Sequence, residues 1–507
     1  MSLALVHSRA SAGVAAPPVR VEVHLSGGLP ATQIVGLPEA AVRESRDRVR
    51  AALLCACFEW PQRRITINLA PADLPKEGGR FDLPIALGIL AACGELPVEA
   101  LAGREFIGEL ALTGELRGVS GVLPSVLAAH RQGHALFLPA DNATEAGLAH
   151  QATSHPARTL LQVCAHLRGT ALLPRATAPE ALHLSSLTSA ANLAQVRGQH
   201  QARRALEIAA AGGHHLLLSG PPGCGKTLLA GCLPGLLPPL DDDQALETAA
   251  VQSAAGQAPD PRNWRRPPFR APHHSASAVA LVGGGSHPRP GEISLAHNGV
   301  LFLDELPEWQ RHTLDVLREP LEAGTVTIAR AARSTVFPAR FQLVAAMNPC
   351  PCGWAGDPSG RCRCPEERIN RYLGRVSGPL LDRIDLQLHV PRLDPATLAR
   401  PGPAAESTAV VAARVGEARL RQYLRQGVTN AHLDAAGTET HCALADADRQ
   451  LLQSAIERLQ LSARSLQRIL RVARTIADLS GNPGIDRAAL TEALGYRQLD
   501  RQRAASG

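Results

Sequence analysis

The chain has 507 residues, a formal net charge of +6 and 45 % hydrophobic residues, and at roughly 100–200 residues per domain this length predicts about three domains. No apolar run approaches the ~18 residues that a membrane span needs, and the first residues lack the features of a signal peptide, so we expect a cytoplasmic protein without membrane contacts. The mildly basic charge permits nucleic-acid binding but does not require it.

Residues 1–170 alternate short strand-like runs with helical stretches, which is typical of an α/β or α+β domain. The expected strands are residues 19–25, 65–69 and 135–138, and the expected helices are residues 38–57, 83–93 and 124–132. Residues 171–188 are rich in Pro, Ala, Ser and Thr without a clear period, and they predict a linker.

Residues 189–390 again alternate strands and helices and contain a phosphate-binding motif. Residues 391–412 contain four prolines, which predict a second linker. Residues 413–507 are mostly helical by pattern, with the clearest periodicity in residues 446–459 and 463–479. The predicted fold class is therefore α/β, with an additional helical region at the C-terminus.

The phosphate-binding motif is GPPGCGKT, at residues 220–227, between an apolar strand and a helical stretch. Its glycines allow backbone N–H groups to point at phosphate oxygens, and the following helix start adds a favourable dipole. Lys226 is placed to reach the β- and γ-phosphates, and the Thr227 hydroxyl to bind Mg²⁺. The predicted nucleotide contacts come from Gly220, Pro221, Pro222, Gly223, Cys224, Gly225, Lys226, Thr227 and Leu228.

Two more predicted strands end in polar residues that would complete this site. Residues 300–303 are apolar, as in a central parallel strand, and are followed by Asp304 and Glu305. Because ligands bind at the carboxyl ends of such strands, we expect Asp304 to hold Mg²⁺ and Glu305 to orient or deprotonate the attacking water. The other predicted strand begins at residue 341, in the phrase FQLVAAMNP, and ends at Asn348. Asn348 would position that water, although Asn before Pro is also a frequent turn signal.

Four cysteines form two C-x-C pairs within 15 residues: Cys350, Cys352, Cys362 and Cys364. Four thiolates suit a structural, tetrahedral Zn²⁺, although the spacing is tighter than the usual C-x₂₋₄-C. The alternative is four thiols without a metal, sensitive to redox conditions. The other seven cysteines are scattered, and we expect them to be small buried hydrophobic residues.

These phrases together resemble the magnesium-chelatase-like AAA+ ATPases of the ComM/YifB group. The resemblance covers nearly the whole chain, from GLPEAAVRESRDRVRAAL at residues 36–53, through GEISLAHNGVLFLDEL and AAMNPCPCG, to ARSLQRILRVARTIADL at residues 463–479. It implies a hexameric ATPase that uses ATP and Mg²⁺, with a helix-2 insert and a pre-sensor hairpin in the AAA+ core and a C-terminal helical lid. For competence members of the group it implies DNA branch migration during natural transformation.

The N-terminal block also resembles the proteolytic domain of Lon, an α+β fold of the ribosomal S5 type. The nucleophilic serine of that domain is replaced here by Arg80, and its catalytic lysine would fall near Leu123, in a stretch without any lysine from residue 77 to 225. A Ser–Lys dyad needs both groups, so we expect the fold without the peptidase chemistry. Lys76 is then a structural residue or a ligand contact.

Two arginines match positions that AAA+ proteins use to complete a site. Arg383, in LLDRIDL, falls where the family places an arginine finger, which acts on the neighbouring subunit's nucleotide and so requires a ring. The alternative for Arg383 is an internal network with Asp382 and Asp385. Arg464 is our choice for the lid arginine that senses the nucleotide, and its competitors on the same helix face are Arg468 and Arg471.

Residues 322–338 predict a β-hairpin, which AAA+ relatives aim into the pore of the ring. Arg330 and Arg333 lie near its tip and are candidates for contacts with DNA phosphates. Residues 270–285 form a second insertion, rich in Gly and His, that is a candidate pore loop. Its His273 and His274 are solvated or packed histidines in one interpretation and metal ligands in the weaker one.

The favoured function is a DNA motor, a homo-oligomeric ring that binds single-stranded or branched DNA through its shape and backbone rather than its base sequence. The alternative is a chelatase-type remodeller driven by ATP that acts on a protein partner. An ATP-dependent protease is the third and weakest hypothesis, because the dyad is missing.

Overall fold

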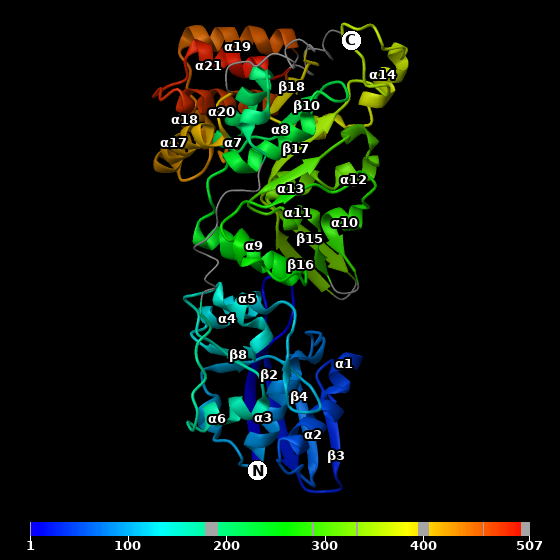
Figure 1. Cartoon of the computed structure of the whole chain (residues 1–507), viewed down its shortest axis with the longest axis vertical. Helices are drawn as coiled ribbons and strands as arrows, with labels where there is room; N and C mark the ends of the chain where they lie inside the picture. The colour runs from blue at the N-terminus through cyan, green and yellow to red at the C-terminus, as the bar shows by residue number, and fades with distance from the viewer. Residues whose placement is uncertain are drawn as a thin grey trace.

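The computed structural model describes residues 2–177, 191–285, 288–330, 333–393, 405–459 and 461–497. Figure 1 shows the N-terminal sheet at one end of an elongated molecule, a second sheet in the middle and the C-terminal helices at the other end. The architecture is mixed α/β with a parallel sheet and a helical C-terminal region, as the sequence predicts at this level. Among the described helices, none has the length and apolar character needed to cross a bilayer.

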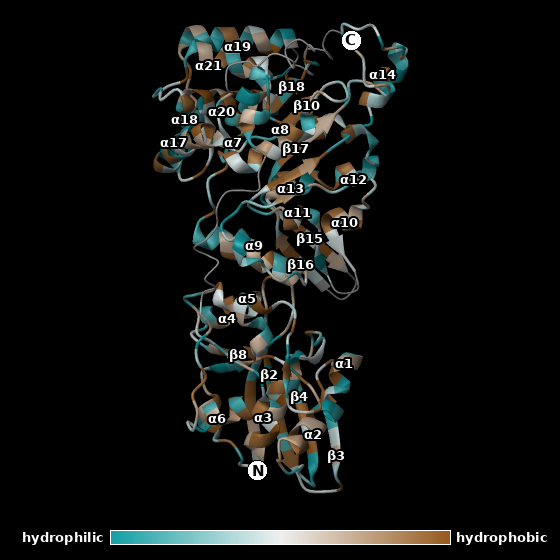
Figure 2. Ribbon diagram, viewed as in Figure 1, coloured by the Kyte–Doolittle hydropathy of each residue, from teal (hydrophilic) through white to brown (hydrophobic). Residues whose placement is uncertain are grey.

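The N-terminal sheet has seven strands in the order β3-β4-β2-β1-β5-β8-β9. Alternate residues of β2 are buried, which is the period-2 pattern of a strand with one face on the core. Helix α3 (Asp82–Ala92) is buried along its whole length and packs on β1 and β2, and Figure 2 shows it largely in the brown of apolar residues. The strands are β1 (Ser2–Arg9), β2 (Pro18–Ser26), β3 (Ala31–Val35), β4 (Arg64–Ala70), β5 (Arg104–Phe106), β8 (Ala135–Pro139) and β9 (Ser154–Ala157).

The helix predicted over residues 38–57 is two helices, α1 (Ala40–Arg43) and α2 (Ser45–Cys55). The break at Glu44 is not signalled by the spacing of apolar residues, which continues across it. The other two helices predicted in this region form close to the expected positions, as α3 and as α4 (Val122–Arg131).

The central sheet has five parallel strands in the order β11-β14-β17-β10-β18. The three in the middle are buried at every position, which explains why their sequences are continuous apolar runs rather than alternating ones. Strand β10, the first of the five in the chain, lies between helices α7 (His200–Gly212) and α8 (Lys226–Cys232) in the sequence. The strands are β10 (Leu216–Ser219), β11 (Phe269–Arg270), β14 (Val300–Leu303), β17 (Gln342–Met347) and β18 (Leu386–His389).

An inserted layer lies between the central sheet and the N-terminal domain. Helix α9 (Asp242–Ala254) packs against α4, and the Ser253 hydroxyl donates a hydrogen bond to the buried Glu145 carboxylate. The predicted hairpin is present as β15 (Thr325–Arg330) and β16 (Arg333–Pro338), and Figure 1 shows it near this junction. The same layer contains α10 (Ala278–Val282), α11 (Glu292–Leu295) and a short antiparallel pair of strands, β12 (Gly283–Gly284) and β13 (Arg289–Pro290).

The C-terminal helices share one hydrophobic core with α7, β10 and β18. Helices α19 (Asp446–Leu459) and α20 (Ala463–Leu479) begin and end where the sequence period predicts. The buried Arg497 joins the end of this region to the sheet, because its guanidinium donates to the carbonyl of Ile384 at 2.8 Å and to the Ser465 hydroxyl at 2.9 Å. The other helices are α17 (Thr408–Gln426), α18 (Ala435–His441) and α21 (Arg487–Gly495).

Two predictions from composition need correction. The second linker, residues 391–412, extends too far, because α17 already begins at Thr408, after the last proline of the segment. The predicted burial of the scattered cysteines is wrong for Cys55, Cys57 and Cys93, which are exposed, because a cysteine is small enough to be tolerated at the surface. Residues 178–188 of the first linker and 394–404 of the second lie outside the described residues.

The most deeply buried carboxylate among the described residues of the C-terminal region is that of Asp478, which is 1 % exposed. It accepts hydrogen bonds from Arg425 at 2.7 Å, Arg474 at 2.8 Å and Asn430 at 2.8 Å. Burial alone would raise the pKa of Asp478, but the hydrogen bonds from Arg425 and Asn430 and the charge of Arg474 lower it below its ordinary value. The carboxylate therefore stays charged and ties α17 to α20.

We expect Asp478→Ala to destabilise the C-terminal region by about 3 kcal/mol, because it removes the carboxylate that pairs with the buried charge of Arg474. Urea unfolding followed by circular dichroism measures the change. Asp446→Ala is the control, since its ion pair with Arg449 is exposed and its loss should give no measurable shift. Equal shifts for the two variants would contradict this account.

Candidate nucleotide-binding site

Three adjacent strands bring the predicted nucleotide-site residues to one edge of the central sheet. The loop at residues 220–225 follows β10, Asn348 follows β17, and Asp304 follows β14. The ammonium group of Lys226 donates to the Asn348 side-chain oxygen at 3.2 Å, and the Thr227 hydroxyl donates to the Asp304 carboxylate at 3.0 Å. The structure thus brings together side chains that are up to 122 positions apart in the chain.

The phosphate-binding loop is shaped by its glycines. Gly223 and Gly225 have φ of +75° and +91°, a region that other residues rarely adopt. A Cβ atom on Gly220 would lie 2.2 Å from the carbonyl oxygen of Val390, so only glycine fits there. Lys226, in the first turn of α8, is 9 % exposed and donates to the carbonyls of Gly220 at 2.7 Å and Pro221 at 3.0 Å. These neutral partners leave its charge available for a phosphate.

The two acids after β14 differ in their surroundings. Asp304 is held by the backbone N–H of Glu305 at 2.8 Å, and the Trp309 indole donates to the Asp304 carbonyl at 3.0 Å. Glu305 has φ of +51°, which is strained for a residue with a side chain. Its carboxylate lies 3.1 Å from the Nδ1 atom of His274.

No sequence pattern predicts the contact between His274 and Glu305. His274 belongs to the Gly- and His-rich insertion, and its ring lies 4.1 Å from that of His273, whose Nδ1 atom is 2.8 Å from the Ser275 hydroxyl. Within the described ranges, the four clustered cysteines are the one group of His, Cys, Asp and Glu side chains arranged to hold a metal ion. Among the described residues, therefore, no third ligand joins His273 and His274 to form a metal site.

Arg383 and Arg464 meet at one carboxylate, Glu322. Arg383 is 7 % exposed, pairs with Glu322 at 2.5 Å and donates to the carbonyl of Pro379 at 2.7 Å. Arg464 reaches the same Glu322 oxygen at 3.8 Å and is 65 % exposed. Glu322 closes α13 (Arg318–Ala323) just before the hairpin, and sequence reasoning did not single it out.

The residues named in the alternative assignments, Asp385, Arg468 and Arg471, have other contacts. Asp385, one partner of the alternative network, instead pairs with Arg468 at 2.7 Å and accepts from the backbone N–H of His215 at 2.8 Å. Burial alone would raise the pKa of Asp385, but Arg468 and His214 hold this pKa well below its ordinary value. Arg471 donates to the Thr438 hydroxyl at 3.1 Å. Arg468 and Arg471 are both half-buried, whereas Arg464 is exposed, so Arg464 is the most exposed of the three lid candidates.

The paired arginines lie at the opposite end of the sheet from the phosphate-binding loop. Arg383 precedes β18, whereas residues 220–225 follow β10, and these two strands are parallel neighbours. Four strand residues span about 13 Å, so the sheet itself separates Arg383 from the phosphate site of its own chain.

The four clustered cysteines converge, with all four sulfur atoms within 4.8 Å of one another. The pKa of Cys352 is lowered to about 6, first by a hydrogen bond from the Trp354 backbone and further by the neighbouring thiols. A thiolate is the form that binds a metal.

The remaining candidates are the two hairpin arginines. Arg330 and Arg333 are register partners at the turn of β15 and β16, while their side chains lie outside what the structure describes. Val326 and Ile328 anchor the base of the hairpin in the core.

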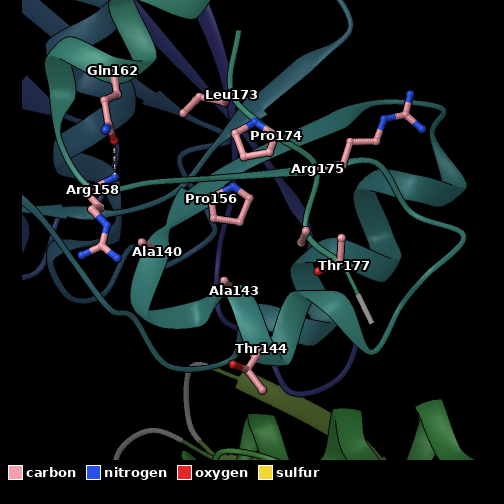
Figure 3. Close-up of a pocket in the computed structure, with 11 residues that line it drawn as sticks. Ala140, Ala143, Thr144, Pro156, Arg158, Gln162, Leu173, Pro174, Arg175 and Thr177 are labelled. Atoms are coloured by element: carbon pink, nitrogen blue, oxygen red, sulfur yellow. Dashed lines mark hydrogen bonds between the residues drawn. The ribbon is translucent and has the colours of Figure 1, made fainter. Parts of the chain in front are cut away.

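A pocket in the N-terminal domain is separate from these residues (Figure 3). Figure 3 shows the Arg175 side chain directed away from the other labelled residues. The backbone N–H of Arg158 donates a hydrogen bond to the side-chain oxygen of Gln162 at 2.8 Å. No predicted nucleotide-site residue lines it. Its walls are mostly small or apolar: Ala140, Ala143, Thr144, Pro156, Arg158, Gln162, Leu173, Pro174, Arg175, Ala176 and Thr177.

Three family profiles match successive parts of the chain. They describe subunit ChlI of Mg-chelatase over residues 21–142, magnesium chelatase subunit ChlI over residues 192–398, and its C-terminal part over residues 405–497. The chain is 53 % identical to competence protein ComM of Haemophilus influenzae over 504 residues, and 51 % identical to YifB of Salmonella typhimurium over 502 residues; each match covers 99 % of this chain and 98 % of the relative. A stretch of 140 residues, 28 % of this chain and 14 % of the relative, is 29 % identical to DNA replication licensing factor MCM4 of Drosophila melanogaster.

We expect Glu305→Gln to keep ATP binding but to lower ATP hydrolysis at least about 100-fold, because glutamine cannot accept a proton from water. Phosphate release and calorimetric titration with ATP measure the two properties. Glu308→Gln, which alters an exposed acid paired with Arg375, is the matched control and should hydrolyse ATP normally. Unchanged hydrolysis in Glu305→Gln would refute its assigned role.

Proposed function

We propose that this chain, which belongs to the magnesium-chelatase family of AAA+ proteins together with ComM and YifB, is an ATP-hydrolysing ring motor that acts on DNA. The observation that carries the proposal is the pair of contacts from Lys226 to Asn348 and from Thr227 to Asp304, across three adjacent strand ends. These groups are what a triphosphate and its metal ion require at such an edge.

Each residue of the site then has one task. Lys226 would exchange its carbonyl partners for the β- and γ-phosphates, and the N–H groups of the glycine-rich loop would bind the remaining phosphate oxygens. Thr227 and Asp304 supply the oxygen ligands that Mg²⁺ prefers, and the ion offsets phosphate charge when bound. Asn348 orients the attacking water, and Glu305 accepts its proton after separating from His274.

The position of the two arginines supports a ring. Because Arg383 and Arg464 lie at the amino end of the sheet, the phosphate that they stabilise belongs to a neighbouring copy of the chain. Their shared partner, Glu322, holds Arg383 and Arg464 near each other until that neighbour docks. We propose a hexamer, the assembly that the family resemblance implies.

DNA is the proposed substrate because of the hairpin and the relatives. The hairpin places Arg330 and Arg333 side by side at its turn, and two basic residues there suit the phosphates of a strand in the pore. The names of two relatives, competence protein ComM and DNA replication licensing factor MCM4, refer to competence and to DNA replication. We therefore propose helicase or branch-migration activity on single-stranded or branched recombination intermediates, in the cytoplasm, during natural transformation.

A chelatase-type remodeller of a protein partner is the second candidate, because all three matching profiles are named after magnesium chelatase. In that case a protein rather than DNA would stimulate ATP hydrolysis. The N-terminal domain does not favour either candidate, because it resembles Lon in sequence while the profile that matches residues 21–142 is named after subunit ChlI of Mg-chelatase.

We propose that residues 1–170 form a Lon-like domain without peptidase activity. The Arg80 guanidinium, at the nucleophile's position, is buried and donates to the carbonyl of Ser120 at 2.6 Å, close to Leu123. Burial lowers the pKa of Arg80 to about 10, and the buried Lys76 donates to the carbonyl of Pro71. Both cations bond to backbone oxygens, which is a structural role.

The remaining assignments concern the other two domains. We propose residues 189–390 as the AAA+ core, with α9 to α11 as its helix-2 insert and β15–β16 as its pre-sensor hairpin, and residues 413–507 as the helical lid. The cofactors are ATP and Mg²⁺, joined by a structural Zn²⁺ at the four cysteines.

We expect ATP hydrolysis by the wild-type protein to rise several-fold with forked DNA, Holliday junctions or single strands at low salt, and not with casein. Lys226→Ala should be inactive under all conditions. Replacing both Arg330 and Arg333 by alanine should weaken DNA binding and reduce its salt slope by about 2. Absence of DNA binding and of stimulation by every DNA would end the motor proposal.

We expect Arg383→Ala and Glu305→Gln each to lose ATP turnover, and their mixture to regain part of it. In the mixture, Glu305→Gln subunits supply the arginine that completes the intact site of an Arg383→Ala neighbour. Activity is measured after the subunits are mixed and reassembled, with circular dichroism confirming that both variants are folded. An inactive mixture would mean that Arg383 does not act between subunits.

A further inference from the structure

The four clustered cysteines have the geometry of a site for one metal ion. The sulfur of Cys350 lies 3.3 Å from that of Cys352 and 3.7 Å from that of Cys362, and the latter two are 3.6 Å apart. A tetrahedral ion with Zn–S bonds of 2.3 Å places its sulfurs about 3.8 Å apart. An iron–sulfur cluster would spread its thiolates further, because they bind different iron atoms.

The backbone of the loop that carries these cysteines brings their four sulfur atoms close together. Gly353, Gly356 and Gly360 have φ of +84°, +76° and +64°, so three left-handed turns fold the segment back on itself. Cys350 is fully buried, and its sulfur accepts the backbone N–H of Ala355 at 3.3 Å, a bond that stabilises a metal-bound thiolate. All four cysteines are free thiols.

The same loop rests on the phosphate-binding loop. A Cβ atom on Gly353 would lie 2.6 Å from Cδ of Pro222 and 3.9 Å from Cγ of Asn348. Gly353 therefore sits between the phosphate-binding loop and the residue that contacts Lys226, with no room for a side chain.

A second contact ties the loop to the neighbouring strand end. The Trp354 ring lies 5.7 Å from the guanidinium of Arg392, just beyond β18, and 4.9 Å from that of Arg361 within the loop. The cysteine loop thus covers the carboxyl ends of β10, β17 and β18.

We propose that Cys350, Cys352, Cys362 and Cys364 bind one structural Zn²⁺, and that the zinc-held loop fixes Pro222 and Asn348 in the positions that nucleotide binding requires. The second half of this inference rests on the proposed ATPase function, whereas the first half does not. Loss of zinc should loosen the loop, remove the contact of Gly353 with Pro222 and weaken nucleotide binding.

The metal site is tested on the full-length protein purified without chelators. Elemental analysis should find about one zinc ion per chain, and a thiol-blocking mercurial should release it to a colorimetric zinc indicator. Cys352→Ser combined with Cys362→Ser should lose the zinc and lower the melting temperature. Cys93→Ser, which alters an exposed cysteine outside the cluster, should keep both. A wild-type protein without zinc after reconstitution with the metal would overturn the site.

The coupling is tested with two glycines of the same loop. Gly353→Ala and Gly356→Ala impose a similar backbone strain, but only the first places a methyl group against Pro222, since a Cβ on Gly356 meets nothing within 4 Å. Both variants should retain zinc, and Gly353→Ala alone should bind a fluorescent ATP analogue about tenfold more weakly.

The two parts of the idea fail separately. Equal nucleotide affinity in the two alanine variants, both with zinc, would overturn the coupling and leave the metal site standing. A zinc-containing wild-type protein that binds no adenine nucleotide would overturn the proposed ATPase and the coupling with it.

Discussion

The hydrogen bond between Lys226 and Asn348 depends on one constraint, the parallel pairing of β10 with β17. In that pairing Ser219 is opposite Met347, so the residues that follow each strand leave the sheet at the same level. A shift of register by one residue would turn every buried side chain of β10 to the other face of the sheet. The buried apolar runs on both strands therefore fix the polar site at their ends.

The sheet also separates the two halves of the proposed reaction. The carboxyl ends of its strands carry the loop, the acids and Asn348, whereas the amino end carries Arg383 with Glu322 and Arg464. One chain therefore presents a nucleotide-binding edge on one side and an arginine-bearing edge on the other. Such a pair of unlike surfaces suits head-to-tail contacts between copies, and contacts of this kind form a ring where the rotation between copies closes.

The inserted segment, residues 270–285, lies between the hairpin and Glu305. His274 contacts Glu305 at one end of the insertion, and at the other end Gly283 lies against Ile328 of the hairpin, where an added Cβ would be 2.8 Å from the Ile328 side chain. The segment therefore contacts both the hairpin and Glu305. The cysteine loop plays a different part, because it rests on the phosphate-binding loop and not on the acids.

The sequence alone determined the features that depend on neighbouring residues: the loop at residues 220–227, the apolar strands, the hairpin, helices α19 and α20, and the grouping of the four cysteines. Local patterns sufficed because turns and periods are set within a few residues. Only the tertiary structure decided that Glu305 meets His274, that Glu322 joins Arg383 to Arg464, and that Gly353 rests on Pro222. Those contacts depend on the order of the strands in the sheet, which the hydrophobic effect selects for the whole chain and no local pattern records.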